Sequence, residues 1–170
     1  MPSSMDTMIA KGSGVVKSME ARLHGLVGVF RTLAEQHGEV SALMKRVNND
    51  ADKRADLWPK IRSELVSHEK GELREVYPVL RELPETRALA DRHEAEATEL
   101  SSLIDRINTT PMASEEWGRF FEQLVDMVES HAEEEERDIF PPAQQAIGPD
   151  RAREIEPKFL AVKKQIAHTA

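Results

Sequence analysis

The chain has 170 residues, of which 39% are hydrophobic, 32% are charged and 5% are aromatic, and its formal net charge is −8. This length suffices for one compact domain with its own core. The negative charge and the scattered lysine and arginine residues argue against nucleic-acid binding. Because the chain contains no cysteine, disulfides, iron–sulfur clusters, thiolate zinc sites and cysteine nucleophiles are excluded.

The start of the chain contains no continuous apolar stretch of the kind found in signal peptides. No part of the chain approaches the roughly 18 consecutive apolar residues needed to span a bilayer. We therefore expect a cytoplasmic protein that has no membrane or nucleic-acid partner and forms a single domain over residues 1–170.

Residues that favour helix dominate the composition, and proline and glycine divide the chain into five predicted helices. These are expected to cover about residues 14–47, 58–83, 85–107, 114–142 and 150–170. Ser114 is suited to cap the start of the fourth helix. Beyond these ranges, residues 1–13 carry no clear pattern.

The first predicted helix has an apolar residue at alternating steps of three and four, which is typical of a helix packed in a bundle. The third helix follows the same rule from Leu89 to Ile107. In the first helix a single member of the series is polar, and it is His37. The series comprises Val16, Met19, Leu23, Leu26, Phe30, Leu33, His37, Val40, Met44 and Val47.

The chain contains two copies of one helix pair. The second and fourth helices match at one constant separation, which aligns His68 with His131 and Tyr77-Pro78 with Phe140-Pro141. The first and third helices match at a slightly shorter separation, which aligns His37 with His93. Because the connections are short, the sequence predicts an all-α, up-down antiparallel four-helix bundle with a fifth, C-terminal helix.

Six residues with metal-binding side chains interrupt the apolar faces of these helices. In each His-x-x-x-Glu pair the two side chains lie one turn apart on the same helix face, so both can reach one point in the bundle interior. The six candidate ligands are His37, His68, Glu72, His93, His131 and Glu135.

Imidazole and carboxylate ligands suit iron, manganese or zinc. Two glutamates with two pairs of histidines indicate two metal ions bridged by carboxylates, roughly 3.5–4 Å apart as in other two-metal sites. Burying these carboxylates without a cation would be very costly. A ferritin-like site is excluded because it requires Glu-x-x-His pairs, and no histidine here has a glutamate three positions earlier.

With these motifs, the sequence resembles the haemerythrin-like, or HHE cation-binding, domain family. The resemblance covers about residues 33–145, which leaves residues 1–32 as an N-terminal helix extension and residues 150–170 as an additional helix. The segments that carry it are Glu35-Gln36-His37, His68-Glu69-Lys70-Gly71-Glu72 with Tyr77-Pro78, His93-Glu94, and His131-Ala132-Glu133-Glu134-Glu135-Glu136 with Phe140-Pro141. The resemblance implies two non-haem iron ions, bridging glutamates, and dioxygen, nitric oxide or peroxide as the small molecule that meets them.

One departure from the family concerns the residue four positions after His93. Haemerythrins that carry oxygen have a second histidine there, whereas this chain has Ala97. Our first expectation is a di-iron protein that binds or senses dioxygen or nitric oxide. The alternatives are a di-iron enzyme for peroxide breakdown or iron-cluster repair, and an iron store or structural bundle.

Further residues near the predicted site have several possible roles. Glu96 is an extra ligand, an outer acceptor that orients an imidazole, or a residue that reaches solvent, and Glu69 is a candidate terminal ligand. Tyr77 and Phe140 are expected to plug the end of the bundle. Gly71 either leaves space for a small ligand or permits close helix packing, and His24 and His168 are expected to be surface residues.

The apolar series of the first helix extends back to Val16, beyond the part that bears ligands. We expect this extension to be covered within the chain by an apolar stripe on the C-terminal helix, formed by Ile155, Phe159, Val162 and Ile166. The protein would then be a monomer, and a homodimer formed through the same stripe is the alternative.

Overall fold

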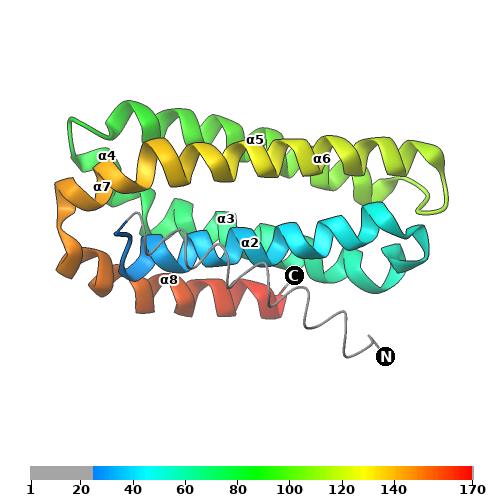
Figure 1. The fold of residues 1–170 in the computed structure, drawn as a ribbon, viewed down its shortest axis with the longest axis horizontal. Coiled ribbons are helices and arrows are strands. Elements are labelled where there is room, and N and C mark those ends of the chain that lie inside the picture. The colour runs from blue at the N-terminus through cyan, green and yellow to red at the C-terminus, as the bar shows by residue number, and fades with distance from the viewer. Residues whose placement is uncertain (1–24, 170) are drawn as a thin grey trace.

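A computed structural model describes residues 25–169, and every regular element in this part of the chain is helical. Four long helices run along one axis and are joined by short connections at their ends (Figure 1): α2 (Gly28–Asn49), α3 (Arg54–Glu75), α5 (Arg87–Thr109) and α6 (Glu115–Glu134). The predicted all-helical class is therefore confirmed for the described residues. Ser114 caps α6 as expected, because its hydroxyl accepts a hydrogen bond from the Trp117 backbone N–H at 3.1 Å.

Four short elements and a further long helix complete the described part of the structure. A 3₁₀ turn, η1 (Ala51–Lys53), precedes α3, and α4 (Tyr77–Glu82) connects α3 to α5. After α6 the chain continues through a π-helical turn, η2 (Glu135–Ile139), and through α7 (Phe140–Ile147) into α8 (Pro149–Thr169). Helix α8 packs along α2 and α3, outside the four long helices (Figure 1). No helix among the described residues is both long enough and apolar enough to cross a membrane.

A proline bends the chain at the same place in each repeat. Pro78 and Pro141 lack the backbone N–H that would continue the helical hydrogen bonding. The bends fall at Val76 (φ −102°, ψ −58°) and at Ile139 (φ −108°, ψ −56°), two residues before each proline. The predicted end of the fourth helix at residue 142 is wrong, because α7 uses the proline in its first turn and continues to Ile147. Helix α3 also begins earlier than predicted, at Arg54, which brings Leu57 into the core.

The predicted continuous helix over residues 14–47 is wrong where the structure describes it. Residues 25–27 are not helical, and α2 begins at Gly28, whose φ of +58° lies in the left-handed region. A side chain here is also excluded by space, because a Cβ on Gly28 would lie 2.4 Å from the Ala152 carbonyl carbon. The Gln144 side chain fixes this turn by accepting from the Val27 N–H at 2.7 Å and donating to the Gly25 carbonyl at 2.7 Å. The remaining residues of that prediction, 14–24, lie outside the described part, as does His24.

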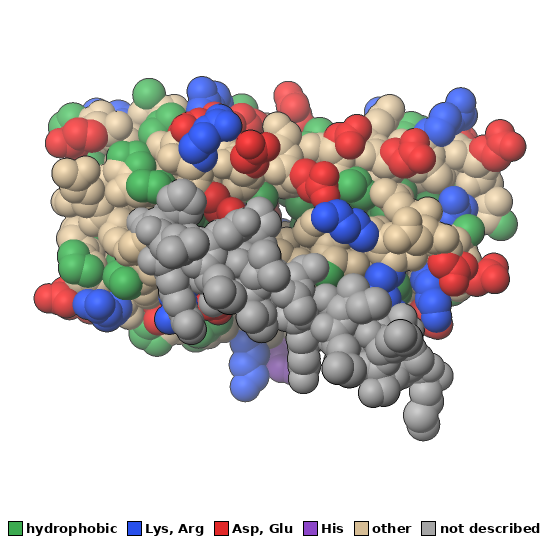
Figure 2. Space-filling model, viewed as in Figure 1, with side chains coloured by type: hydrophobic (Ala, Val, Ile, Leu, Met, Phe, Trp, Pro, Cys, Tyr) green, Lys and Arg blue, Asp and Glu red, His purple; other side chains and the backbone are tan. Residues whose placement is uncertain are grey.

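The core consists of two separate hydrophobic clusters. One lies at the α4 and α7 end and includes Leu26, Phe30, Phe140, Ile155 and Phe159, so α8 covers the described part of the N-terminal apolar series. The other lies towards the η1 end and is built around a second set of residues, including Met44, Trp58, Ile107, Trp117 and Phe121. The candidate ligands lie between the two clusters. Where side chains are visible in this view, acidic and basic ones are interspersed along the edge that carries α6 (Figure 2).

Candidate metal centre

The six candidate ligands come together in the middle of the bundle. Helices α2 and α5 each supply one histidine, α3 supplies a histidine and a glutamate, and α6 with the start of η2 supplies the last pair. The carboxylates of Glu72 and Glu135 are fully buried. The π-helical turn begins at Glu135, and such turns occur frequently at functional sites.

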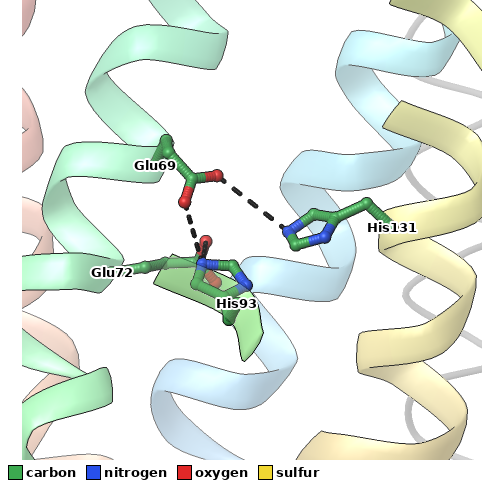
Figure 3. Close-up of side chains that lie close together, drawn as sticks. All are labelled: Glu69, Glu72, His93 and His131. Carbon is green, nitrogen blue, oxygen red and sulfur yellow. Dashed lines mark ion pairs between the residues drawn. The ribbon is translucent and has the colours of Figure 1, made fainter. Parts of the chain in front are cut away.

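One group of donors, which we call the Glu69 group, consists of Glu69, Glu72, His93 and His131 (Figure 3). One ligand atom from each of these residues lies within 4.8 Å of all the others. Glu69 Oε1 lies 2.8 Å from His93 Nε2, and Glu69 Oε2 lies 4.0 Å from His131 Nε2. Glu69, the candidate terminal ligand, therefore points into the centre, whereas its counterpart in the second repeat is Ala132.

The second group of donors, the His37 group, consists of His37, His68 and Glu135, and its ligand atoms also lie within 4.8 Å of one another. His37 Nε2 lies 3.2 Å from His68 Nε2 and 3.2 Å from Glu135 Oε2. The two groups thus have different compositions, with two carboxylates in the first and one in the second.

Each of the two predicted bridging glutamates contacts both groups. Glu72 Oε2 lies 3.4 Å from His68 Nε2 and 3.9 Å from His93 Nε2. Glu135 Oε2 lies near His37, while its Oε1 lies 3.3 Å from His93 Nδ1 and 3.5 Å from His131 Nε2. Carboxylates in these positions are able to bridge two ions.

Three of the four histidines have an acceptor on the ring nitrogen that faces away from the centre. Nδ1 of His37 lies 3.0 Å from Glu136, Nδ1 of His68 lies 2.9 Å from Gln36, and Nδ1 of His131 lies 3.0 Å from Glu96. Such acceptors hold a proton on Nδ1 and leave the Nε2 lone pair free for a metal. Of the roles considered for Glu96, the structure supports that of an outer acceptor, because its carboxylate orients the His131 imidazole. The roles of Gln36 and Glu136 were not predicted, because outer acceptors have no fixed spacing in sequence.

Tyr77 and Phe140 do more than plug the end of the bundle. The Tyr77 ring stacks on His93 with 3.7 Å between ring centroids, and Phe140 stacks on His37 at 6.0 Å. The Tyr77 hydroxyl also donates a hydrogen bond of 2.5 Å to Glu135 Oε1. Since Phe140 occupies the matching position in the second repeat, a phenol is present on only one side of the centre. The sequence shows that Tyr77 aligns with Phe140, but it does not show that the Tyr77 hydroxyl bonds to Glu135.

The structure also decides between the two interpretations of Gly71. A Cβ at this position would lie 2.7 Å from the Phe159 ring, so glycine permits α8 to pack closely against α3. Phe159 in turn contacts His68 edge-on, with 6.0 Å between ring centroids. Helix α8 therefore covers the His37 group on its α3 side.

Burial and mutual charge give these side chains unusual protonation behaviour. Burial lowers the pKa of His37, but its close interactions with the Glu135 and Glu136 carboxylates outweigh that effect and raise the pKa to about 9. Burial lowers the pKa of His68 well below its ordinary value, and the positive charge of His37 acts in the same direction. The pKa of Glu72 is raised well above its ordinary value by burial and by the neighbouring Glu135 and Glu69 carboxylates. Such carboxylate repulsion is relieved when a cation binds between the groups.

The scarcity of hydrogen bonds to the candidate ligand atoms also indicates a metal centre. Seven side-chain atoms of the centre, on Glu69, Glu72, His93, His131 and Glu135, are buried without a hydrogen-bond partner among the described residues. Leaving so many buried polar atoms unpaired is costly unless something else satisfies them. Nitrogen and carboxylate oxygen donors converging on two points are what first-row divalent metals bind.

Comparison with known protein families agrees with this geometry. Residues 28–143 match the family described as "Hemerythrin HHE cation binding domain". The chain belongs to this haemerythrin family. The match spans α2 to the first half of α7, so it includes every ligand candidate and excludes α8.

The chain is also similar, at low sequence identity, to a curated protein. The chain is 24% identical over 162 residues to a protein named "DNA nickase" from Nostoc sp. (strain PCC 7120 / SAG 25.82 / UTEX 2576). That alignment covers 92% of this chain and 44% of the relative, so the chain spans less than half of that protein's length. No solved structure matches the chain.

Proposed function

We propose that this haemerythrin-family chain is a non-haem di-iron protein that binds or senses dioxygen or nitric oxide. In this proposal the up-down four-helix bundle holds one iron through the His37 group and the other through the Glu69 group. Glu72 and Glu135 bridge the two ions, and Glu69 is a terminal ligand of the second. Two-metal binding is supported by the paired donor groups and by the buried, unpaired ligand atoms.

The observation that carries the choice of ligand is a small cavity of about 30 Å³ inside the centre. Its wall includes His37, His68, Glu69 and His131, so it touches both groups. Most of the remaining lining residues are apolar, and Gln36, Glu64 and Lys163 are the polar ones. A cavity of this size holds roughly one or two small molecules of the size of water. A mostly apolar wall favours a neutral diatomic molecule over an ion in this cavity.

When bound, iron would supply an open coordination position for a small ligand and the capacity to exchange electrons. The chain's own residues position the ligands of the metal. Gln36, Glu96 and Glu136 orient the imidazoles, and the two hydrophobic clusters pack the bundle on either side of the centre. Ala97 is buried beside the Glu69 group and leaves open the space that oxygen carriers fill with a fifth histidine.

A specific observation also supports peroxide breakdown as a second candidate. The Tyr77 hydroxyl is buried and hydrogen-bonded to Glu135, so a proton donor stands next to a candidate bridging carboxylate. Splitting an O–O bond requires protons, which a donor in this position is able to supply. The nicking activity of the Nostoc relative is not proposed for this chain, because the two align over less than half of that protein.

Metal analysis tests the proposal. The wild-type chain is expected to hold two iron ions, and His68→Ala or His131→Ala should lower the content well below two. Glu72→Ala and Glu135→Ala should disrupt the pair by removing a bridge. Glu122→Ala, on an exposed position of α6, is the control and should keep full iron content. If all four ligand variants retain wild-type iron, the proposed centre is wrong.

Optical spectra of the iron-loaded protein separate the two candidate functions. Under the first, the spectrum changes on adding dioxygen or nitric oxide and reverts when the gas is removed. Under the second, added peroxide is consumed catalytically with release of gas. An iron-loaded protein that responds to none of these molecules would contradict both.

A further inference from the structure

A second cavity, of about 140 Å³, reaches the Glu69 group from outside between α5 and α6. Unlike the interior cavity, it is lined by four carboxylates: Glu69, Glu96, Glu99 and Glu134. We call it the acidic cavity. His131 and Ala97 also contribute to its wall, so it reaches the metal centre itself.

The carboxylates follow one another from the surface to the centre. Glu99 is exposed, Glu96 and Glu134 are half-buried, and Glu69 is 8% exposed. Arg92 is the basic side chain near them, since it forms an ion pair with Glu134 and lies 3.9 Å from Glu96. The cavity therefore keeps a net negative charge, which attracts cations and repels anions.

Two candidate metal ligands, Glu69 and His131, lie at the inner end of the acidic cavity. Glu69 Oε1 is buried and faces His93 Nε2 at 2.8 Å, and His131 Nε2 is buried without a hydrogen-bond donor or acceptor in the described part of the chain, its nearest carboxylate oxygen being Glu135 Oε1 at 3.5 Å. Both residues line the cavity and point towards each other in the Glu69 group (Figure 3). A buried carboxylate and two imidazole nitrogens that converge at the end of an acidic passage, with too few hydrogen bonds to satisfy them, together point to a divalent cation as the occupant.

We propose that the acidic cavity is a transit site through which Fe²⁺ enters the metal centre, with Glu69 as the residue that receives it. This inference rests on the proposed di-iron function and adds the route by which the metal arrives. The other two cavities are less suitable for a cation, because each has a lysine in its wall. A larger cavity of about 340 Å³ between α3 and α5 has Lys70 in its wall beside Glu69 and Glu94, and the 30 Å³ cavity has Lys163 in its wall.

The proposal predicts that charge at the mouth controls the rate of metal uptake but not the final metal content. Surface charges change association rates of ions strongly at low ionic strength, and salt screens them. Glu99 is suited to test this because it is exposed and lies outside both ligand groups. Arg92 allows the opposite change, because its removal makes the mouth more negative.

The experiment measures Fe²⁺ uptake by the metal-free chain under nitrogen. Unbound Fe²⁺ is removed with a chelator at set times, and the iron that stays with the protein is counted. Glu99→Lys should take up iron roughly three- to tenfold more slowly than wild type at low ionic strength, and the difference should shrink at about 0.5 M salt. Glu122→Lys, which changes the net charge equally on an exposed position of α6, should load at close to the wild-type rate, and Arg92→Gln should load faster.

The outcomes separate this inference from the proposed function. If Glu99→Lys and Glu122→Lys load at the same rate and reach full iron content, the acidic cavity is not the route. If Lys70→Glu accelerates loading while Glu99→Lys has no effect, iron enters between α3 and α5 and the inference is wrong. If the wild-type chain never binds iron, the proposed function itself fails.

Discussion

The hydrogen bond from Tyr77 to Glu135 offers a sharp test of how this centre is held together. Tyr77→Phe removes the hydroxyl and keeps the ring that stacks on His93. The hydroxyl is buried with Tyr77 at 1% exposure, and Glu135 is fully buried. Water therefore has little access to replace the lost donor, and Glu135 Oε1 loses its short hydrogen bond.

The magnitude follows from that burial. Leaving a buried polar group without its partner costs about 1–3 kcal/mol, with the upper part of the range for a charged acceptor. For a protein of this size such a loss corresponds to a decrease of roughly 3–10 °C in Tm. We expect this decrease in the metal-free protein and a smaller one after iron loading, because bound metal would then compensate the Glu135 charge.

Thermal unfolding followed by circular dichroism, with and without iron, measures both decreases. Tyr77→Leu is the matched variant, since it removes the stacked ring as well and should be more destabilising than Tyr77→Phe. Peroxide consumption by iron-loaded Tyr77→Phe should also fall if the phenol supplies a proton. A Tyr77→Phe protein with wild-type Tm in both states would show that the hydrogen bond to Glu135 contributes nothing, and our reasoning about this side of the centre would be refuted.

Three further predictions follow from other parts of the structure. Ala97→His should place a fifth imidazole beside the Glu69 group and slow the reaction of the iron-loaded protein with dioxygen and peroxide; unchanged spectra and rates would mean that this side chain does not face the metals. Because the pKa of His37 is raised to about 9, its contribution to the stability of the metal-free protein is complete below pH 6.5 and is lost as the pH rises through 9. Urea unfolding should then show a loss of up to about 3 kcal/mol over this window, absent in His37→Gln, and a flat profile in the wild type would contradict it. Removing residues 150–170 should uncover Leu26 and Phe30, which α8 buries, and convert a monomer into dimers or aggregates in light scattering; a truncated chain that stays monomeric and equally stable would argue against this role of α8.

Several features of this protein could be predicted from its sequence because they depend only on local periodicity. The three-and-four spacing specifies which residues share a helix face, and the internal duplication aligns His68 with His131 and Glu72 with Glu135. Six polar side chains on otherwise apolar faces must meet in the interior if those faces form the core. The structure brings these six residues together in two groups of donors.

Other features depend on how the helices are bent and placed against each other, which a helix periodicity does not contain. The turn at Gly25–Gly28 exists because α8 approaches the backbone there and Gln144 bonds to it, and both contacts come from the far end of the chain. Glu136 lies in the π-helical turn and Tyr77 directly follows the first proline bend, so the orientation of these segments brings both to the centre. Gln36 reaches His68 because α2 packs against α3. The asymmetry of the centre begins in the sequence, because the repeat aligns Glu69 with Ala132. Only the tertiary structure shows that the Glu69 carboxylate meets His93 of α5, at 2.8 Å.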